Sequence, residues 1–240
     1  YKQEESAGYD ASRSREYSWV REYSLIDRLA REWPAGSTVL DIPCGTGRLI
    51  PLFQKRGHRV ICGDISAHMM GQISDANREM PAVRGLIQVE AERLPFADNS
   101  VDYVVSLRLF HFELPVVTAE TMLREFGRIA RKGIIIHGPI EQWRLVPKVA
   151  DAVVEIVYSG VFAPVQFLQR GKRAVELLKH RLTPGGQSAS NSHTPNGDPV
   201  FACTPPELES VLGPEGFHVT KSYGAISPIS TKRIHMIEKA

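Results

Sequence analysis

The chain has 240 residues, 42% of them hydrophobic, and carries 29 Lys and Arg against 27 Asp and Glu. That length is enough for one large α/β domain with an insertion, and the hydrophobic fraction allows a substantial core. Because the charges nearly balance, without the basic excess of proteins that neutralise phosphates, nucleic acid is not a favoured partner.

The first regular element that the sequence predicts is an amphipathic helix over residues 18–31. Its apolar positions recur at helical spacing: Trp19, Tyr23, Ile26, Leu29 and Ala30. We expect residues 1–33 to form a helical cap on a single domain that covers residues 1–240.

Strands and helices then alternate, which predicts a mostly parallel sheet with helices on both faces. The expected strands lie near residues 37–42, 59–64, 85–90, 102–108 and 133–138. The expected helices lie near residues 46–56, 66–79 and 116–131. Residues 217–225 and 232–238 form two more strands with no helix between them, so an antiparallel strand closes a sheet of seven.

The run VLDIPCGTGRL at residues 39–49 joins an apolar strand to a glycine-rich turn and a helical pattern. Gly45 and Gly47 lack a Cβ, so the backbone can turn tightly and bring its N–H groups to a polar ligand at a helix N-terminus. Asp41 would repel a pyrophosphate, but it suits a cofactor with an amino group or a cationic centre. This combination points to S-adenosylmethionine.

The same run resembles motif I of the class I methyltransferases. Pro43 stands where that family has its first glycine, so this position can still turn but has no N–H to donate. Cys44 matches the cysteine of the usual pattern. A turn whose glycines serve only packing is the alternative interpretation.

A second apolar strand, HRVICGDI at residues 58–65, contains the acid Asp64, which lies 19 residues after Gly45. At this spacing in nucleotide-binding α/β folds, the acid accepts hydrogen bonds from both ribose hydroxyls. Asp64 could also serve as the N-cap of a helix that begins at Ser66, and the two roles are compatible.

The third motif, EAERLPFADNSVD at residues 90–102, resembles another methyltransferase signature. The resemblance implies that Glu90 binds the adenine amino group and that the N–H of Ala91 meets a ring nitrogen. Glu92 is either a cofactor ligand or part of a solvated charged loop.

The three motifs cover roughly residues 36–112, and the chain is most similar there to small-molecule methyltransferases of the ubiquinone and menaquinone type. That resemblance implies a Rossmann-like fold and S-adenosylmethionine as cofactor. The cofactor-binding residues that we expect are Asp41, Pro43, Cys44, Gly45, Gly47, Asp64, Ile65, Met69, Glu90, Ala91, Glu92 and Ser106.

A long excursion at residues 141–216 separates the fifth strand from the sixth. Long insertions in compact domains are usually functional or disordered. We expect a helical lid over an apolar acceptor, with a packing or dimerisation appendage as the alternative. Within this excursion, Thr204 followed by two prolines predicts a helix start.

Three residues are candidates for the chemistry. His111, after the fourth strand, could act as a general base because an imidazole titrates near neutral pH, or it could only shape the pocket. His137, at the end of the fifth strand, is a second candidate at the lip of the site. Arg108 could hold an acceptor carboxylate or simply pair with an acid.

We therefore expect methyl transfer to a small, apolar or aromatic acceptor at oxygen or carbon, such as a quinone-like or secondary metabolite. The alternatives are an RNA or protein methyltransferase and a non-catalytic S-adenosylmethionine-binding protein. A nicotinamide dehydrogenase would need a third glycine after Gly47.

The remaining expectations concern the location of the protein, membrane spans and the oligomeric state. Three cysteines without metal-ligand spacing favour a reducing cytoplasm, with neither disulfides nor a metal site. No apolar run reaches the roughly 18 residues of a membrane span. We expect a monomer or homodimer. The chain begins at Tyr1 rather than Met, which is compatible with the removal of a tag, a leader or an upstream region.

Overall fold

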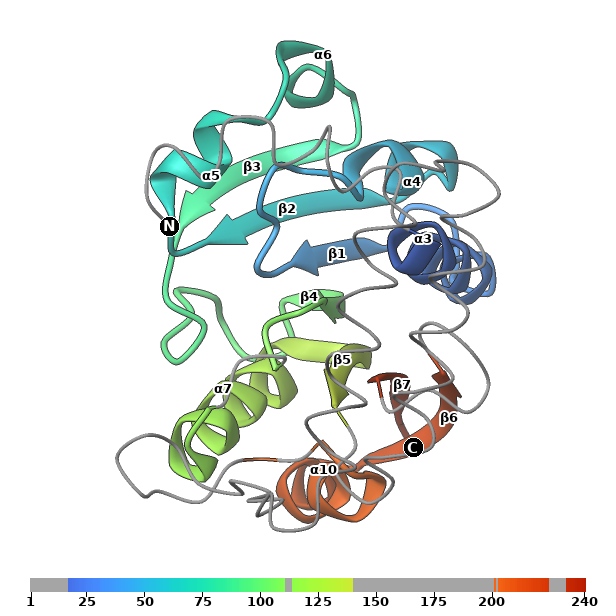
Figure 1. Cartoon of the computed structure of the whole chain (residues 1–240), viewed down its shortest axis with the longest axis vertical. Helices are drawn as coiled ribbons and strands as arrows, with labels where there is room; N and C mark the ends of the chain where they lie inside the picture. Colours follow the sequence, from blue (N-terminus) through green and yellow to red (C-terminus); the bar gives the residue numbers. More distant parts are fainter. Residues whose placement is uncertain (1–16, 111–113, 140–200, 202, 225–231) are drawn as a thin grey trace, which may run out of the picture.

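The computed structural model describes residues 17–110, 114–139, 201, 203–224 and 232–240. Their strands form one seven-stranded sheet in the order β3-β2-β1-β4-β5-β7-β6 (Figure 1). The strand bounds are β1 Thr38–Asp41, β2 Arg59–Asp64, β3 Val83–Gln88, β4 Val101–Ser106, β5 Ala130–Pro139, β6 Phe217–Gly224 and β7 Lys232–Lys239.

Strands β1 to β5 pair in parallel, and β7 runs antiparallel between β5 and β6. The predicted fold class, a Rossmann-like, mostly parallel seven-stranded sheet with an antiparallel strand near its end, is confirmed. Strand order reverses between β1 and β4, and open α/β sheets bind ligands beyond the carboxyl ends of the strands at such a point.

Helices pack on this sheet and connect its strands. Their bounds are α3 Tyr17–Ala30, α4 Ile50–Lys55, α5 Ala67–Gly71, α6 Asp75–Arg78, α7 Val116–Ile129 and α10 Pro205–Leu212, with the 3₁₀ turn η2 at Gly213–Glu215. The predicted helices at 18–31 and 116–131 agree with α3 and α7 to within two residues.

Two helix predictions were too long. The helix expected at 46–56 begins only at Ile50, because the preceding glycine turn adopts positive φ angles that a helix does not allow. The helix expected at 66–79 is divided into α5 and α6, which are N-capped separately by Ser66 and Ser74. Each serine accepts a backbone N–H and so favours a new helix start.

Two strands also end earlier in the chain than the sequence predicts. The strands expected at 85–90 and 102–108 end at Gln88 and Ser106. Residues 107–109 and 89–92 therefore leave the ladder at the carboxyl edge, where they belong to loops beside the predicted site.

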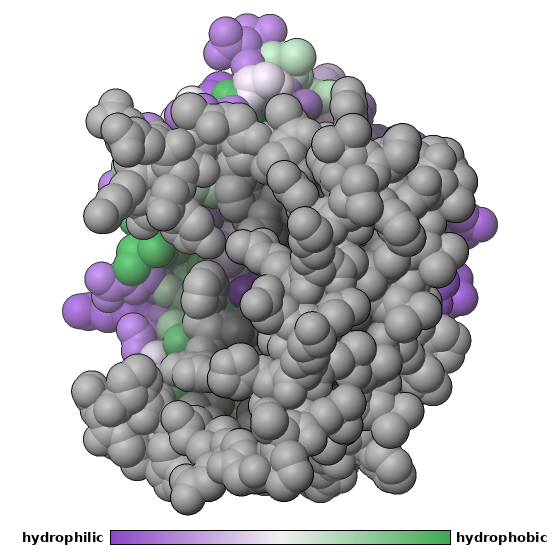
Figure 2. Space-filling view, in the orientation of Figure 1, coloured by the Kyte–Doolittle hydropathy of each residue, from purple (hydrophilic) through white to green (hydrophobic). Residues whose placement is uncertain are grey.

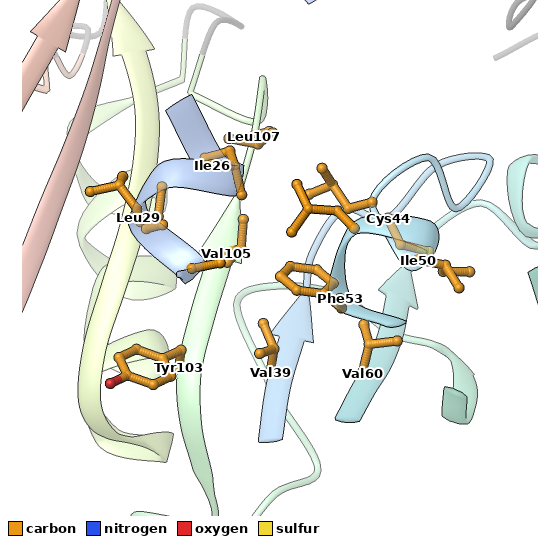
Figure 3. Packing of buried hydrophobic residues seen from close by; sticks show 14 of the residues in the cluster. Ile26, Leu29, Val39, Cys44, Ile50, Phe53, Val60, Tyr103, Val105 and Leu107 are labelled. Carbon is orange, nitrogen blue, oxygen red and sulfur yellow. The ribbon is translucent and has the colours of Figure 1, made fainter. Parts of the chain in front are cut away.

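The core lies on both faces of the sheet. Because side chains alternate along a strand, Ile135 packs on one face and Ile134 and Ile136 on the other. The first face carries α3 and α4, and Figure 3 shows Ile26 and Phe53 from these helices over the strands. The second face carries α7 and α10. Helices thus cover both faces, as the alternating pattern predicts.

The insertion expected at 141–216 can be described only near its end, because residues 140–200 lie outside the described part of the chain. Thr204 forms the predicted N-cap of α10, in a capping box with Glu207.

In the view of Figure 2, hydrophilic residues are visible around α6, which buries none of its side chains. No helix among the described residues has the length and apolarity needed to cross a membrane.

Candidate functional site

A pocket opens at the carboxyl ends of β1, β2 and β4, beside the point where the strand order reverses. Its walls come from α3 and from the segments that follow these three strands. The lining residues are Trp19, Asp41, Pro43, Cys44, Gly45, Thr46, Arg48, Leu49, Asp64, Ile65, Ser66, Met69, Leu107, Arg108 and Leu109.

The glycine turn is shaped by its own backbone bonds. Gly45 and Gly47 have φ angles of 54° and 72°, in the left-handed region that favours glycine. The N–H of Gly47 donates to the carbonyl of Cys44 at 2.9 Å. A Cβ on Gly47 would lie 2.7 Å from Cδ1 of Ile50. Gly47 therefore builds the turn but, contrary to expectation, does not line the pocket.

Asp64 ties this turn to the end of β2. One carboxylate oxygen accepts the N–H of Gly45 at 2.8 Å, and the other accepts the N–H of Ser66 at 2.8 Å. The N-cap of α5 is Ser66, so the predicted capping role of Asp64 was wrong by two residues. A carboxylate has about four lone-pair sites, so the two backbone bonds leave acceptor capacity for hydroxyl groups.

Asp41 lies beside Asp64 and is 2% exposed. Burial, with a further contribution from the Asp64 charge, raises the pKa of Asp41 to about 8, although Arg48 opposes the shift. Near neutral pH this carboxyl group is therefore largely protonated. A cationic group placed here would favour its ionised form, so the pair of acids fits an amino group or a sulfonium better than a phosphate.

The other cofactor candidates on β1 and β2 also converge on the pocket. Pro43, Cys44, Ile65 and Met69 all line it. Ile65 is 63% exposed, an unusual position for a large apolar side chain, so it offers an apolar surface to a ligand. A hydrogen bond with Cys62 and burial raise the pKa of the Cys44 thiol, so Cys44 is an unreactive wall residue.

Besides Gly47, four predicted cofactor residues do not line the pocket as described. Glu90 and Glu92 are exposed and Ala91 is half-buried, in the loop after β3. This loop starts beside the site, because the N–H of Val89 donates to the carbonyl of Asp64 at 2.9 Å. Ser106, at the end of β4, is wholly buried.

The opposite wall comes from α3, for which the sequence predicts only a cap. Trp19 lines the pocket, and the guanidinium carbon of Arg48 lies 3.9 Å from the centroid of its ring, in a cation–π contact. Trp19 belonged to a helical apolar pattern, which predicts core packing and gives no sign of a pocket. Leu107 and Leu109, next to the predicted Arg108, add apolar surface.

Arg108 pairs with an acid, one of the two roles expected for it. Its Nε donates to the Oε2 atom of Glu22 on α3 at 2.9 Å, and the Glu22 side chain is 2% exposed. The Nδ1 atom of the wholly buried His137 lies 3.9 Å from Oε1 of the same carboxylate. His137 therefore lies in the interior instead of at the lip of the site. His111 lies outside the described residues.

Comparisons with known proteins agree with this geometry. The family model described as a methyltransferase domain matches residues 39–133. The ubiquinone/menaquinone biosynthesis C-methyltransferase UbiE of Stenotrophomonas maltophilia is 38% identical over 122 residues, which are 48% of this chain and 45% of that protein. The malonyl-[acyl-carrier protein] O-methyltransferase of Hamiltonella defensa is 30% identical over 102 residues, 42% of this chain and 36% of that protein. The matches thus span less than half of these relatives.

The fold has a solved counterpart in the magnesium protoporphyrin IX methyltransferase of Synechocystis with bound S-adenosylhomocysteine. The TM-score is 0.57 at 16% identity, over 92% of this chain and 84% of that one. The matched family segment contains the glycine turn and both acids of the pocket. Residues 39–133 are thus similar to a methyltransferase domain, and the fold is that of a solved methyltransferase with bound S-adenosylhomocysteine.

Proposed function

We propose that this protein transfers the methyl group of S-adenosylmethionine to a small, apolar or aromatic molecule, at oxygen or carbon. One observation carries the proposal. The two acids and glycine turn that suit the cofactor line the same pocket as Trp19 and Leu107, which suit an apolar acceptor. The relatives named as C- and O-methyltransferases support transfer to carbon or oxygen, and the one named for ubiquinone and menaquinone biosynthesis supports a quinone-like acceptor.

In this proposal the polar wall holds the cofactor. Asp64 accepts the ribose hydroxyls with its remaining lone pairs, while its bonds to Gly45 and Ser66 keep it in place. Asp41 faces the amino group or the sulfonium. Glu90 and the N–H of Ala91 bind the adenine edge, and Ile65 and Met69 cover its faces.

When bound, S-adenosylmethionine supplies an electrophilic methyl group that an acceptor atom displaces in line. The chain contributes mainly by orienting that atom, an effect that accounts for several kcal/mol of a two-substrate barrier. Trp19 and Leu107 exclude water from the acceptor side. A base is needed only for an acceptor that must lose a proton, and His111 is the proposed base. His137 is a second candidate; its burial beside Glu22 favours a structural role.

The test is turnover of S-adenosylmethionine that carries a labelled methyl group, with the purified protein and acceptors of different chemistry. We expect label on a hydroquinone, phenol or small carboxylic acid, and loss of transfer in Asp64→Ala but not in Asp75→Ala on α6. Saturable labelling of RNA with a steep salt dependence would indicate a nucleic-acid enzyme instead. Tight cofactor binding without label on any acceptor would indicate a binding protein.

Two further points belong to the proposal. We assign the protein to a reducing cytoplasm, because three cysteines without metal-ligand spacing do not form a disulfide framework. For the insertion at 141–216, most of which lies outside the described residues, the lid stays a proposal from the sequence: hydrogen exchange across it should slow most when cofactor and acceptor are both bound. Exchange that responds to no ligand would favour a packing or dimerisation appendage.

A further inference from the structure

We infer that Glu22 is a positioning residue for methyl transfer, because it fixes Arg108 on the acceptor side of the pocket. This inference rests on the proposed function. Glu22 belongs to α3 and touches neither the glycine turn nor the two acids through any described hydrogen bond. Its described partners are Arg108, which lines the pocket, and His137, which lies behind it.

The burial of Glu22 shows how specific this contact is. Its side chain is 2% exposed and that of Arg108 is 17% exposed, so the 2.9 Å bond joins two charges that are largely removed from water. A carboxylate is seldom buried without a partner, because leaving water is costly. The ion pair therefore fixes α3 and the turn after β4 relative to each other.

The backbone of Arg108 adds a second observation. Its φ angle is 64°, in the left-handed region that residues with a Cβ seldom occupy. Such a conformation persists where surrounding contacts determine it. The bond to Glu22 is one such contact, and the result is that the guanidinium group lies 5.9 Å from the ring centroid of Trp19 instead of pointing into solvent.

Arg108 in turn helps to shape the acceptor wall. It lies between Leu107 and Leu109 and shares the wall with Trp19, which is three positions before Glu22 on the same helix. Residues three apart on a helix are neighbours on one face. One helix face thus provides both an aromatic wall and the carboxylate that holds the facing arginine. Displacing Arg108 would disturb the acceptor side more than the Asp64 side.

The same helix offers a matched control. Asp27 on α3 accepts hydrogen bonds from Arg56, next to α4, and this pair is also only partly exposed. It joins α3 to the same sheet face as Glu22 does, but neither residue lines the pocket. If ion pairs on α3 only stabilise the fold, the loss of either one should have similar consequences.

The experiment is a double-mutant cycle on the full chain, with an acceptor that the wild type methylates. Glu22→Gln should lower kcat/KM for the acceptor about 10- to 100-fold, because small displacements of positioning groups cost that much. Affinity for S-adenosylhomocysteine should change less than threefold. Asp27→Asn should change kcat/KM less than threefold. In an Arg108→Gln background, Glu22→Gln should cause less than a twofold further loss.

The readouts separate the possible failures. Additive losses in the cycle, or an equal loss in Asp27→Asn, would overturn the positioning role while leaving the proposed function intact. No methyl transfer by the wild type would instead overturn the proposed function. If Glu22→Gln does not fold, because it removes the carboxylate that faces the Arg108 guanidinium, the double variant removes both charges and can be compared with Arg108→Gln. A further loss of activity in that comparison would contradict the inference.

Discussion

The two walls of the pocket are built in different ways. The polar wall comes from residues that are close in the chain or at family spacing, and its main contacts join Gly45, Asp64 and Ser66. The opposite wall depends on Glu22 and Arg108, which are 86 positions apart. The cofactor side is thus encoded by local motifs, whereas the acceptor side depends on how α3 packs on the sheet. Variants should affect these two walls separately.

The largest effect should come from Gly47→Ala, which tests the local geometry of the polar wall. Left-handed backbone costs an alanine about 1–2 kcal/mol, and overpacking in a core costs about 1–3 kcal/mol. The new Cβ would lie 2.7 Å from Cδ1 of Ile50. We expect the free energy of unfolding, measured with urea, to fall by about 2–4 kcal/mol.

Gly57→Ala is the matched control for this variant. Gly57 has almost the same φ angle, 71°, but nothing lies within 4 Å of a Cβ built there. Only the backbone cost should remain, about 1–2 kcal/mol. If Gly57→Ala destabilises the protein as much as Gly47→Ala, the packing of the turn against Ile50 is not what requires glycine at position 47.

The next effect should come from Asp64→Ala. The charge-assisted bonds to a ligand are worth roughly 1.5–3 kcal/mol, so affinity for S-adenosylhomocysteine should fall about 10- to 100-fold or more. Loss of the acceptor for the N–H groups of Gly45 and Ser66 adds to the effect. Calorimetry measures the change. Unchanged affinity in a folded Asp64→Ala protein would contradict the proposal that Asp64 binds the ribose hydroxyls.

The polar wall could be predicted because its signals are local. The glycine spacing, the acid at the end of β2 and the strand that precedes each of them can be read within short windows, and Asp41, Gly45 and Asp64 all reach the pocket. Gly47 was expected both to form the turn and to approach the ligand; it forms the turn but does not line the pocket, because a sequence shows that a glycine is needed but not which atoms come close to it.

The acceptor wall could not be predicted in the same way. Glu22 occupies a charged position in an amphipathic pattern, where the usual expectation is a solvated side chain. Its burial depends on a partner that the chain supplies after β4. The pairing of Trp19 with Arg48 is likewise a tertiary contact. The predicted bounds of the helix at 66–79 were wrong because the apolar pattern is continuous there, whereas Ser66 and Ser74 each cap a separate helix.

A smaller effect should appear in the pH dependence of cofactor binding, through Asp41. Its folded-state pKa is raised to about 8, so the carboxyl group is protonated below that pH and ionises above it. A ligand cation favours the ionised form. Affinity for S-adenosylhomocysteine should therefore rise between pH 6 and 7.5, by at most about tenfold per pH unit, while the ligand's own amino group stays charged.

Asp41→Asn should remove this dependence, because an amide does not titrate in this range. Its affinity should stay level between pH 6 and 7.5 and match the low-pH affinity of the wild type within a few fold. A wild-type affinity that is independent of pH would show that Asp41 does not face the amino group, which is the cationic group of S-adenosylhomocysteine. In the cofactor-free protein, the raised pKa of Asp41 contributes stability that is lost as the pH rises from about 4 to 8, so the wild type should lose stability relative to Asp41→Asn over this range.

The smallest effect should come from Arg128→Met, which tests whether the polar wall also depends on a distant residue. Arg128 on α7 donates to the carbonyls of Leu94 and Phe96, and so holds the loop that follows the proposed adenine ligands. We expect affinity for S-adenosylhomocysteine to fall about threefold, because an exposed loop loses anchoring but no ligand contact. Arg131→Met, which releases the carbonyls of Asn99 and Ser100 and the carboxylate of Asp102, should leave affinity unchanged. Faster hydrogen exchange across residues 90–96 without any change in affinity would show that this loop does not hold the cofactor, and that the polar wall ends at Asp64.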